Sequence, residues 1–179
     1  MTSIKPDRAA IDRVLVIGCS GSGKSRLAAM LAERLGLPYV ATDPIYWTAD
    51  WRPAPADAVW AWVRDAAAQD RWIMDGNFDA ERDLVWGRAQ RIVWLDLGLA
   101  TVLRQVTMRN LGWWLSREPV WSGRPITLGK AIGGIGHALR SHPLKRAAYP
   151  AALAGFPDAE VVRITSAAAL DAWLGQAAR

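Results

Sequence analysis

The residues best suited to chemistry form one glycine-rich run near the amino terminus of the chain. The run reads Gly18-Cys19-Ser20-Gly21-Ser22-Gly23-Lys24-Ser25 and matches the phosphate-binding pattern G-x-x-x-x-G-K-[ST] at every specified position. Glycines allow the backbone to bend so that consecutive N–H groups point inward, and a helix that begins there adds the positive end of its dipole. The run therefore predicts a nest for an anionic phosphate chain.

Two side chains at the end of this run extend the prediction to a magnesium–nucleotide complex. Lys24 can reach the β- and γ-phosphates of a nucleoside triphosphate, and the hydroxyl of Ser25 can coordinate Mg²⁺. All eight residues of the run are expected to contact the nucleotide. The chain has no Asn-Lys-x-Asp segment of the kind that recognises guanine, so ATP is the expected nucleotide. Cys19 is expected to be a small, tolerated side chain, with a redox-sensitive thiol as the alternative.

A further metal ligand is expected from a carboxylate at the end of a neighbouring strand. Asp75 follows the apolar segment Trp72-Ile73-Met74 and is predicted to hold Mg²⁺ together with Ser25. Asp96 follows a similar segment at 92–95 and is the alternative, although the residues after it resemble the start of a helix. Either carboxylate could instead cap a loop.

A third aspartate, Asp43, follows the short strand expected at 39–42. In a parallel sheet the ligand site lies beyond the carboxyl ends of the strands. Asp43 is therefore predicted to meet a phosphoryl acceptor beside the phosphate nest. An Asx turn before Pro44 is the alternative.

The elements that must position these groups follow from the apolar patterning of the chain. Strands are expected at 14–17, 39–42, 72–74, 92–95 and 160–164. Helices are expected directly after the glycine-rich run with a stop at Gly36, and near 57–69, 99–115, 127–140 and 167–177, with Asp57 as an N-cap and a loop at 44–55. This alternation predicts a parallel sheet that is covered by helices on both faces and joined by right-handed crossovers.

Composition narrows the class of protein. The chain has 179 residues, of which 51% are hydrophobic and 22% charged, so we expect one folded globular domain over 1–179. The single cysteine and two histidines make an internal disulfide impossible and a zinc site improbable. The charged amino terminus is unlike a signal peptide, and no apolar run reaches the length of a membrane span. A cytoplasmic protein without membrane contact is expected.

The net charge of +5 is concentrated in one segment. Residues 99–150 hold eight basic residues against Glu118 alone, a local charge of +7. Such a segment could be a solvated face, a footprint for nucleic acid, or a set of groups that bind phosphates. Charge alone does not choose among these three.

Taken together, these motifs resemble the adenylate-kinase-like P-loop proteins of the DNA topology modulation, or FlaR-like, family. The resemblance covers about residues 13–175. It is carried by VLVIGCSGSGKS, by Asp43 with nearby Trp47 and Trp51, by Trp72-Ile73-Met74-Asp75-Gly76-Asn77-Phe78, by Arg82-Asp83-Leu84-Val85-Trp86 and by Val93-Trp94-Leu95-Asp96.

The resemblance implies a three-layer α/β P-loop kinase-like fold with a five-stranded parallel sheet. It also implies a helical flap over the acceptor at about 44–70 and an arginine-bearing lid at about 104–125, which would give the basic segment a role. Arg104 and Arg109 are similar to the catalytic arginines that flank such a lid, with Arg117 and Arg124 as additional candidates. Arg82 stands where such kinases place a ligand-binding arginine, and Arg88 is nearby. The Asp-Gly-Asn-Phe-Asp run replaces the Asp-Gly-Phe-Pro-Arg of true adenylate kinases, so AMP is not the expected acceptor.

Three functional hypotheses follow. The favoured one is a kinase that transfers the γ-phosphoryl group of ATP to a small molecule or nucleotide, with Lys24, Asp43, Arg104 and Arg109 in catalytic roles. A nucleotide-dependent regulatory or DNA-binding protein is the first alternative. It is disfavoured because no helix-turn-helix or zinc pattern is present. A P-loop ATPase or switch is the second alternative.

Overall fold

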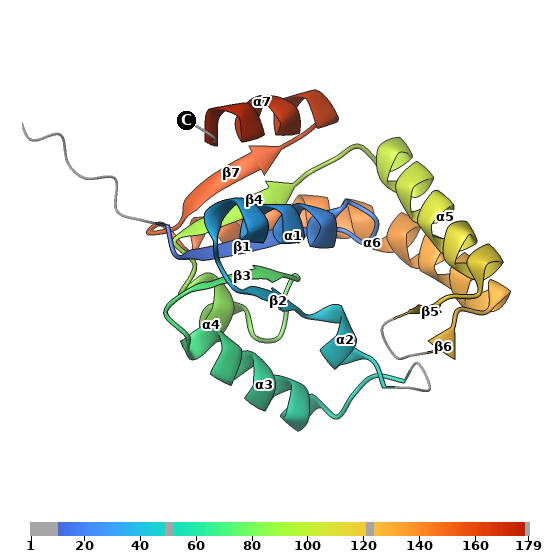
Figure 1. Ribbon diagram of the computed structural model, residues 1–179. Coiled ribbons are helices and arrows are strands. Elements are labelled where there is room, and N and C mark those ends of the chain that lie inside the picture. The colour runs from blue at the N-terminus through green and yellow to red at the C-terminus, as the bar shows by residue number, and fades with distance from the viewer. Residues whose placement is uncertain (1–10, 49–51, 121–123, 178–179) are drawn as a thin grey trace, which may run out of the picture.

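The computed structural model describes residues 11–48, 52–120 and 124–177. Five parallel strands form its central sheet, in the order β2-β3-β1-β4-β7 (Figure 1). Their bounds are β1 Arg13–Gly18, β2 Tyr39–Ala41, β3 Trp72–Asp75, β4 Arg91–Leu95 and β7 Glu160–Ile164. Each strand lies within one residue of its predicted position, and the predicted five-stranded parallel sheet is confirmed.

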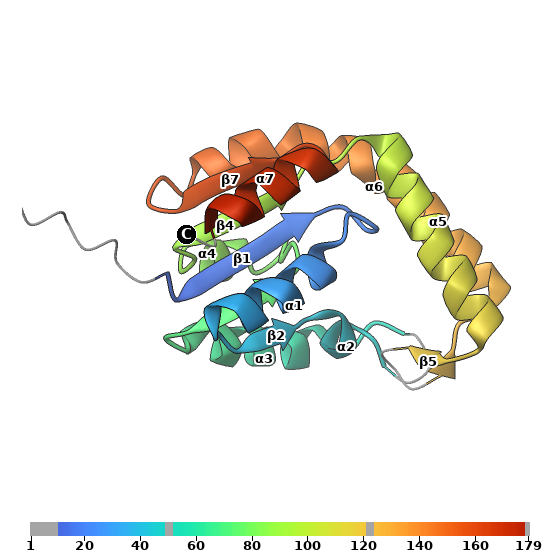
Figure 2. The ribbon, with the colours of Figure 1, turned by 45° about the horizontal axis from the view of Figure 1, so that its top comes forward.

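Two hydrophobic cores lie on opposite faces of this sheet, because successive residues of a strand point to opposite sides. Leu15 and Ile17 of β1 pack in the core that includes α3 (Ala56–Ala68), α4 (Arg82–Trp86) and the second half of α6 (Leu128–Ala154). Val14 and Val16 pack in the core with α1 (Lys24–Leu35) and α7 (Ala167–Ala177). In Figure 2, α1 and α7 lie in front of the strands, and α4 and α6 lie behind them. The fold is therefore a three-layer α/β arrangement.

A cluster of aromatic rings fixes α4 and α6 against the sheet. The ring of Tyr149 in α6 lies edge-on to Trp86 of α4 and to Trp94 of β4, with centroid distances of 5.8 and 5.7 Å. Trp86 and Tyr149 are at most 1% exposed. Such pairs contribute about 0.5–1.5 kcal/mol each beyond the burial of their surface. This cluster holds the side chains of both helices at fixed places near the carboxyl ends of the strands.

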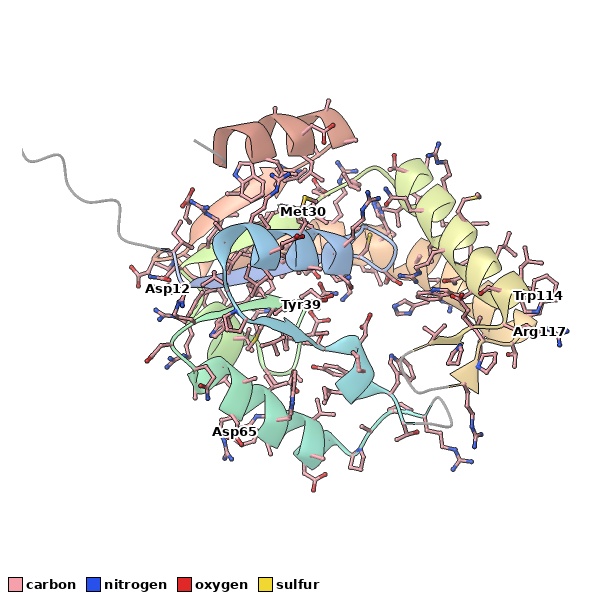
Figure 3. All side chains as sticks on the ribbon, in the orientation of Figure 1. Asp12, Met30, Tyr39, Asp65, Trp114 and Arg117 are labelled. Atoms are coloured by element: carbon pink, nitrogen blue, oxygen red, sulfur yellow. The ribbon has the colours of Figure 1, made fainter. Side chains whose placement is uncertain are left out.

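An antiparallel pair of helices, α5 (Leu99–Ser116) and the first half of α6, extends away from the sheet (Figures 1 and 2). Val102 and Val106 of α5 are fully buried in a third core that includes Cys19 of the glycine-rich run. Between the two helices, the buried amide of Asn110 donates a hydrogen bond to the carbonyl of Ala131 at 3.0 Å. At the far end, where Figure 3 labels Trp114 and Arg117, β5 Pro119–Val120 pairs antiparallel with β6 Arg124–Pro125.

The segment predicted as a loop at 44–55 holds one short helix, α2 Asp43–Tyr46, and a bridge between Trp47 and Pro53. Proline suits the first turn of a helix, so the Pro44 that indicated a loop is compatible with α2. Residues 49–51 and 121–123, which include Trp51 and part of the range expected for a lid, lie outside the described residues.

Other local expectations need correction. Asp57 is not the N-cap of α3, because the helix begins at Ala56 and Pro55 holds the capping position. Helix α6 does not end near 140 but continues to Ala154, with Pro143 and Pro150 inside it. The short helix α4 and the β5–β6 pair were not expected from the sequence. Gly36 does end α1, in the left-handed conformation with φ of 62°. In the described ranges no helix has the length and apolar character to cross a membrane.

Candidate active site

The glycine-rich run forms a tight loop between the buried strand β1 and the amino terminus of α1. Gly21 and Gly23 have φ of 84° and 90°, a backbone conformation that residues with a Cβ atom rarely adopt. Gly23 occupies the N-cap position of α1, and no side chain caps that end of the helix. The first-turn N–H groups of α1 therefore remain available to an anion.

Helix α5 closes one side of this loop. A Cβ atom at Gly21 would lie 2.7 Å from the Cβ of Val106 and 3.1 Å from the carbonyl oxygen of Val102. Only glycine fits between the loop and the helix at this distance. The position of α5 therefore helps to determine the shape of the phosphate loop.

Lys24, the first residue of α1, folds back over the loop. Its Nζ donates a hydrogen bond to the backbone oxygen of Cys19 at 3.2 Å. Burial lowers the pKa of Lys24, while the nearby carboxylates of Asp43 and Asp75 raise it. Lys24 therefore lies near the carboxylates of Asp43 and Asp75 at the mouth of the loop.

Asp75 stands at the end of β3 and is 2% exposed. The hydroxyl of Ser25 donates to one of its carboxylate oxygens at 2.5 Å, and the hydroxyl of Tyr39 donates to the other at 3.0 Å. The hydroxyl of Thr42 donates to the backbone oxygen of Asp75. The expected metal pair, Ser25 and Asp75, is therefore in direct contact. The role of Tyr39 in orienting that carboxylate was not visible in the sequence.

Asp43 begins α2 directly beyond the end of β2. Burial raises the pKa of its carboxyl group, the cations Lys24 and Arg109 lower it, and Asp75 raises it. Arg109 of α5 lies close enough to this group for its charge to affect the pKa of Asp43. Burial lowers the pKa of Arg109, and Asp43 raises it. The guanidinium of Arg109 lies 4.6 Å from the ring centroid of Trp113, which restricts its position.

The structure therefore brings five of the expected residues into one neighbourhood: Lys24, Ser25, Asp43, Asp75 and Arg109. Arg104 is not among them. It stands midway between the buried Val102 and Val106 in sequence, which places it on the opposite side of α5, where its side chain is exposed.

Asp96, the alternative metal carboxylate, is engaged elsewhere. It is 3% exposed and pairs with Arg146 at 3.1 Å and with Arg163 at 2.5 Å. Arg163 in turn lies over the ring of Trp94 at 4.7 Å. This cluster joins β4, α6 and β7, so Asp96 is paired with two arginines, whereas Ser25 is bonded to Asp75. The arrangement favours Asp75 as the metal carboxylate.

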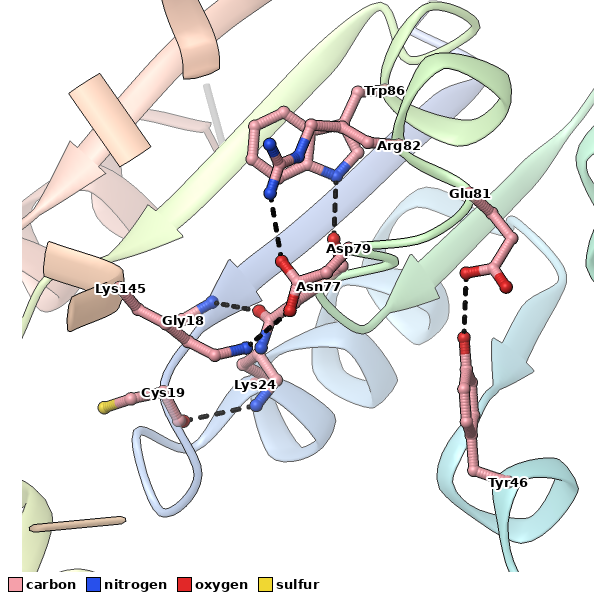
Figure 4. A network of polar contacts seen from close by, with 10 residues as sticks. All are labelled: Gly18, Cys19, Lys24, Tyr46, Asn77, Asp79, Glu81, Arg82, Trp86 and Lys145. Carbon is pink, nitrogen blue, oxygen red and sulfur yellow. Dashed lines mark hydrogen bonds and ion pairs between the residues drawn. The ribbon is translucent and has the colours of Figure 1, made fainter. Parts of the chain in front are cut away.

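The loop after β3 carries further groups, shown with their contacts in Figure 4. The side-chain oxygen of Asn77 accepts a hydrogen bond from the backbone N–H of Gly18 at 3.1 Å and so ties this loop to the phosphate loop. Arg82, the expected ligand-binding arginine, pairs with Asp79 at 3.0 Å and lies 4.9 Å from the ring centroid of Trp86. The sequence singled out the Asp-Gly-Asn segment but not the tether that Asn77 provides.

A recess of about 330 Å³ opens beside this loop. It is lined by Trp60 of α3 and by residues 79–84. Glu81 at its rim accepts a hydrogen bond from the hydroxyl of Tyr46 at 3.2 Å. Its lining combines one aromatic ring with charged groups, which suits a small polar molecule.

The donor set at Ser25 and Asp75 fits Mg²⁺. This ion prefers oxygen ligands, and it usually binds one or two carboxylates together with water and substrate phosphates rather than an all-protein cage. No cluster of three histidine, cysteine or acidic residues suited to a metal ion occurs in the described part of the chain. The residues present would supply a hydroxyl and a carboxylate, and would leave the remaining positions to phosphate and water.

No family model and no curated protein matches the sequence. The fold resembles solved structures of two kinases. One is a gluconokinase from Sinorhizobium meliloti 1021, at 16% identity and a TM-score of 0.52, covering 89% of this chain and 85% of that one. The other is the shikimate kinase from Acinetobacter baumannii in complex with shikimate, at 12% identity and a TM-score of 0.57, covering 94% and 92%. These similarities show the P-loop kinase-like fold. They do not confirm the resemblance to the DNA topology modulation family.

Proposed function

We propose that this chain is an ATP-dependent phosphotransferase that acts on a small molecule. The observation that carries the proposal is the convergence of Lys24, Ser25 and Asp75 at the phosphate loop with Asp43 and Arg109 facing them. The first three are what a magnesium–triphosphate complex needs. The other two are an acid–base group and a cation on the side where an acceptor would approach.

The nucleotide side of the site consists of the loop, Lys24 and the Ser25–Asp75 pair. Loop N–H groups and Lys24 would bind the β- and γ-phosphates, while Ser25 and Asp75 would hold the ion. Held by these residues, Mg²⁺ would neutralise the charge that develops on the leaving ADP. Asp75 is buried, and its carboxylate accepts a hydrogen bond from Tyr39. The carboxylate is therefore already oriented to help hold the ion.

The acceptor side is centred on Asp43. Its carboxylate accepts the hydrogen bond of an acceptor hydroxyl, and the hydroxyl oxygen attacks the γ-phosphorus as the bond to the β,γ-bridging oxygen breaks. The proton passes to Asp43 and the bridging oxygen leaves on ADP. Burial raises the pKa of Asp43, which makes this carboxylate a better proton acceptor than an exposed one. Arg109 stabilises the negative charge on the transferred group.

A small hydroxylated acceptor suits the recess beside this site. Its volume of about 330 Å³ lies at the lower end of the range typical of small-molecule sites. The solved kinases with the same fold support this choice, since one is named a gluconokinase and the other binds shikimate. Both names point to small acceptors rather than to proteins or nucleic acids.

A transfer assay tests the proposal. Release of ADP from Mg-ATP is measured with panels of hydroxy acids, sugars and nucleosides, and the phosphorylated product is identified by mass spectrometry. We expect an acceptor-dependent rate in the wild type and a loss of about 10²-fold or more in Asp43→Asn, which keeps the shape but removes the base. ADP release that no acceptor accelerates, with inorganic phosphate as the only product, would assign the chain to the ATPases instead.

A further inference from the structure

Asp79 binds two cations that come from different elements of the fold. One carboxylate oxygen pairs with Arg82 of α4 at 3.0 Å, and the other pairs with Lys145 of α6 at 3.1 Å (Figure 4). Arg82 and Lys145 are 63 positions apart in the sequence, and both helices are fixed by the aromatic cluster of Trp86 and Tyr149. Together the three groups carry a net charge of +1.

The acidic member of this triad is more exposed than the two cations. The side chain of Asp79 is 56% exposed, whereas those of Arg82 and Lys145 are 31% and 22% exposed. The two cations are therefore the less hydrated partners and depend more on a nearby anion. Asp79 also lies outside helices and strands, in the bend after Phe78, so its carboxylate is the partner best able to move away.

Arg82 has an unused donor at this place. Its Nε atom is buried and has no hydrogen-bond partner among the described residues, although the same guanidinium pairs with Asp79 through Nη2. A guanidinium presents its N–H groups as a planar fork that matches a carboxylate or a phosphate. One arm of the fork is thus engaged by Asp79, and another is buried without an acceptor.

The triad lies between the phosphate loop and the recess. Arg82 and Asp79 line the recess, and Asn77, two residues before Asp79, binds the N–H of Gly18. Burial is the main cause of the lowered pKa of Lys24, and the charge of Lys145 lowers that pKa further. Lys145 therefore also lies near the loop. An anion that displaced Asp79 would therefore sit beside the position of the transferred phosphoryl group.

We propose that Arg82 and Lys145 form the anion-binding part of the acceptor site, and that the acceptor is a hydroxylated small molecule with a carboxylate or phosphate group. The inference rests on the proposed function, since it names the class of acceptor for the same site. Asp79 occupies the place of that anion and yields it to the ligand. Glu81, which lines the recess, and Tyr46, which donates a hydrogen bond to it, remain for the hydroxyl groups of the acceptor.

Binding of small anions tests this site directly. The probes are benzoate, phenyl phosphate and the neutral benzyl alcohol, which share one ring and differ in charge. Calorimetric titrations use wild-type protein saturated with Mg-ADP, so that the phosphate loop is occupied, and the Lys24→Ala variant, in which that loop is weakened. The first condition tests the site in its working state, and the second does not depend on nucleotide binding.

Three variants are expected to change the anion affinity in different ways. Lys145→Met removes the charge but keeps the length of the side chain, and should weaken anion binding about tenfold or more. Asp79→Asn removes the competing carboxylate and should strengthen anion binding about threefold or more. Lys130→Met removes a lysine from the first turn of the same helix and should leave the affinity unchanged. Thermal unfolding of each variant shows that the fold persists.

The two anions separate the two acceptor chemistries, since tighter binding of benzoate indicates a carboxylate and tighter binding of phenyl phosphate indicates a phosphate. Equal affinity for benzyl alcohol, unchanged anion affinity in Lys145→Met, or weaker anion binding in Asp79→Asn would overturn the inference. The Lys145, Asp79 and Lys130 substitutions can also be made in the Lys24→Ala variant. If Mg-ADP fails to bind the wild type but these substitutions change the anion affinity of Lys24→Ala as expected, the proposed function fails and the anion site stands.

Discussion

Arg109 and Arg104 form a matched pair on one helix, and replacing each with alanine should give very different results. Both variants remove the same side chain from α5, but only Arg109 is coupled electrostatically to Asp43, while Arg104 is exposed on the opposite side. A group that stabilises charge only in the transition state contributes about 10²-fold or more to turnover, or about 2.7 kcal/mol. We expect that loss in Arg109→Ala and a change of less than about twofold in Arg104→Ala.

The pH dependence gives a second signature of the same substitution. Asp43 must be ionised to accept a proton, so activity should fall as the pH drops through its pKa, which burial raises above the usual value of about 3.9. Arg109 lowers that pKa. Its removal should therefore move the acidic limb of the pH profile to higher pH, whereas Arg104→Ala should leave the limb in place.

The assay is the initial rate of ADP release with a saturating acceptor, measured from pH 4 to 9 beside the affinity for Mg-ATP. Equal losses of turnover in the two variants would refute the placement of Arg109 at the site. Binding of duplex DNA is measured on the same proteins. If the basic segment served nucleic acid, both substitutions would weaken DNA binding and reduce its salt dependence by about one unit of slope per lost phosphate contact.

Further substitutions test other parts of the site. Asp75→Asn should lower turnover about 10²-fold and raise the Mg²⁺ concentration needed for half-maximal rate, as magnesium titrations of the rate can show. Asp96→Asn should instead lower the melting temperature and leave the magnesium dependence unchanged, because this buried carboxylate holds Arg146 and Arg163. Gly21→Ala should destabilise the protein by about 1–3 kcal/mol in urea unfolding, since the added Cβ would lie 2.7 Å from Val106. Gly23→Ala has a similar positive φ but open space around its Cβ, so a loss as large as that of Gly21→Ala would contradict the clash.

The strands and the phosphate loop were predictable because their determinants are local in the sequence. Short apolar runs bounded by glycine or aspartate form buried parallel strands, and the eight-residue loop carries its chemistry within one turn of chain. The strands and the loop depend little on the packing of distant elements. The direct contact between Ser25 and Asp75 depends also on the strand order, in which β1 and β3 are neighbours, and that order was not predicted from the sequence.

The triad at Asp79 depends on packing that the sequence does not reveal. Lys145 reaches Asp79 only because α6 continues beyond residue 140, where the pattern predicted its end, and through Pro143. An internal proline costs a helix about 3 kcal/mol. Here tertiary contacts offset that cost: the ring of the buried His142 lies 2.8 Å from the carbonyl oxygen of Leu97, and Tyr149 packs in the aromatic cluster.

The separation of Arg104 from Arg109 was accessible to simple geometry. Five residues on an α-helix turn by about 500°, which leaves the two side chains about 140° apart. We nonetheless expected both arginines at the site, because both resemble the lid arginines of nucleotide kinases. Which of the two faces the site depends on how α5 packs, and that is set by Val102 and Val106 against the phosphate loop.

Calorimetric titration of Mg-ATP into the wild type and Lys24→Ala tests the nucleotide site. We expect magnesium-dependent binding by the wild type and an affinity at least about 10²-fold lower in the variant. Circular dichroism of the variant should be unchanged, because Lys24 is only partly buried and is not a member of the three hydrophobic cores. Arg34→Ala, which removes a cation from the last turn of the same helix, should bind as the wild type does. Equal affinity in Lys24→Ala and the wild type, or no binding by either, would contradict the assignment of a nucleotide site to this loop.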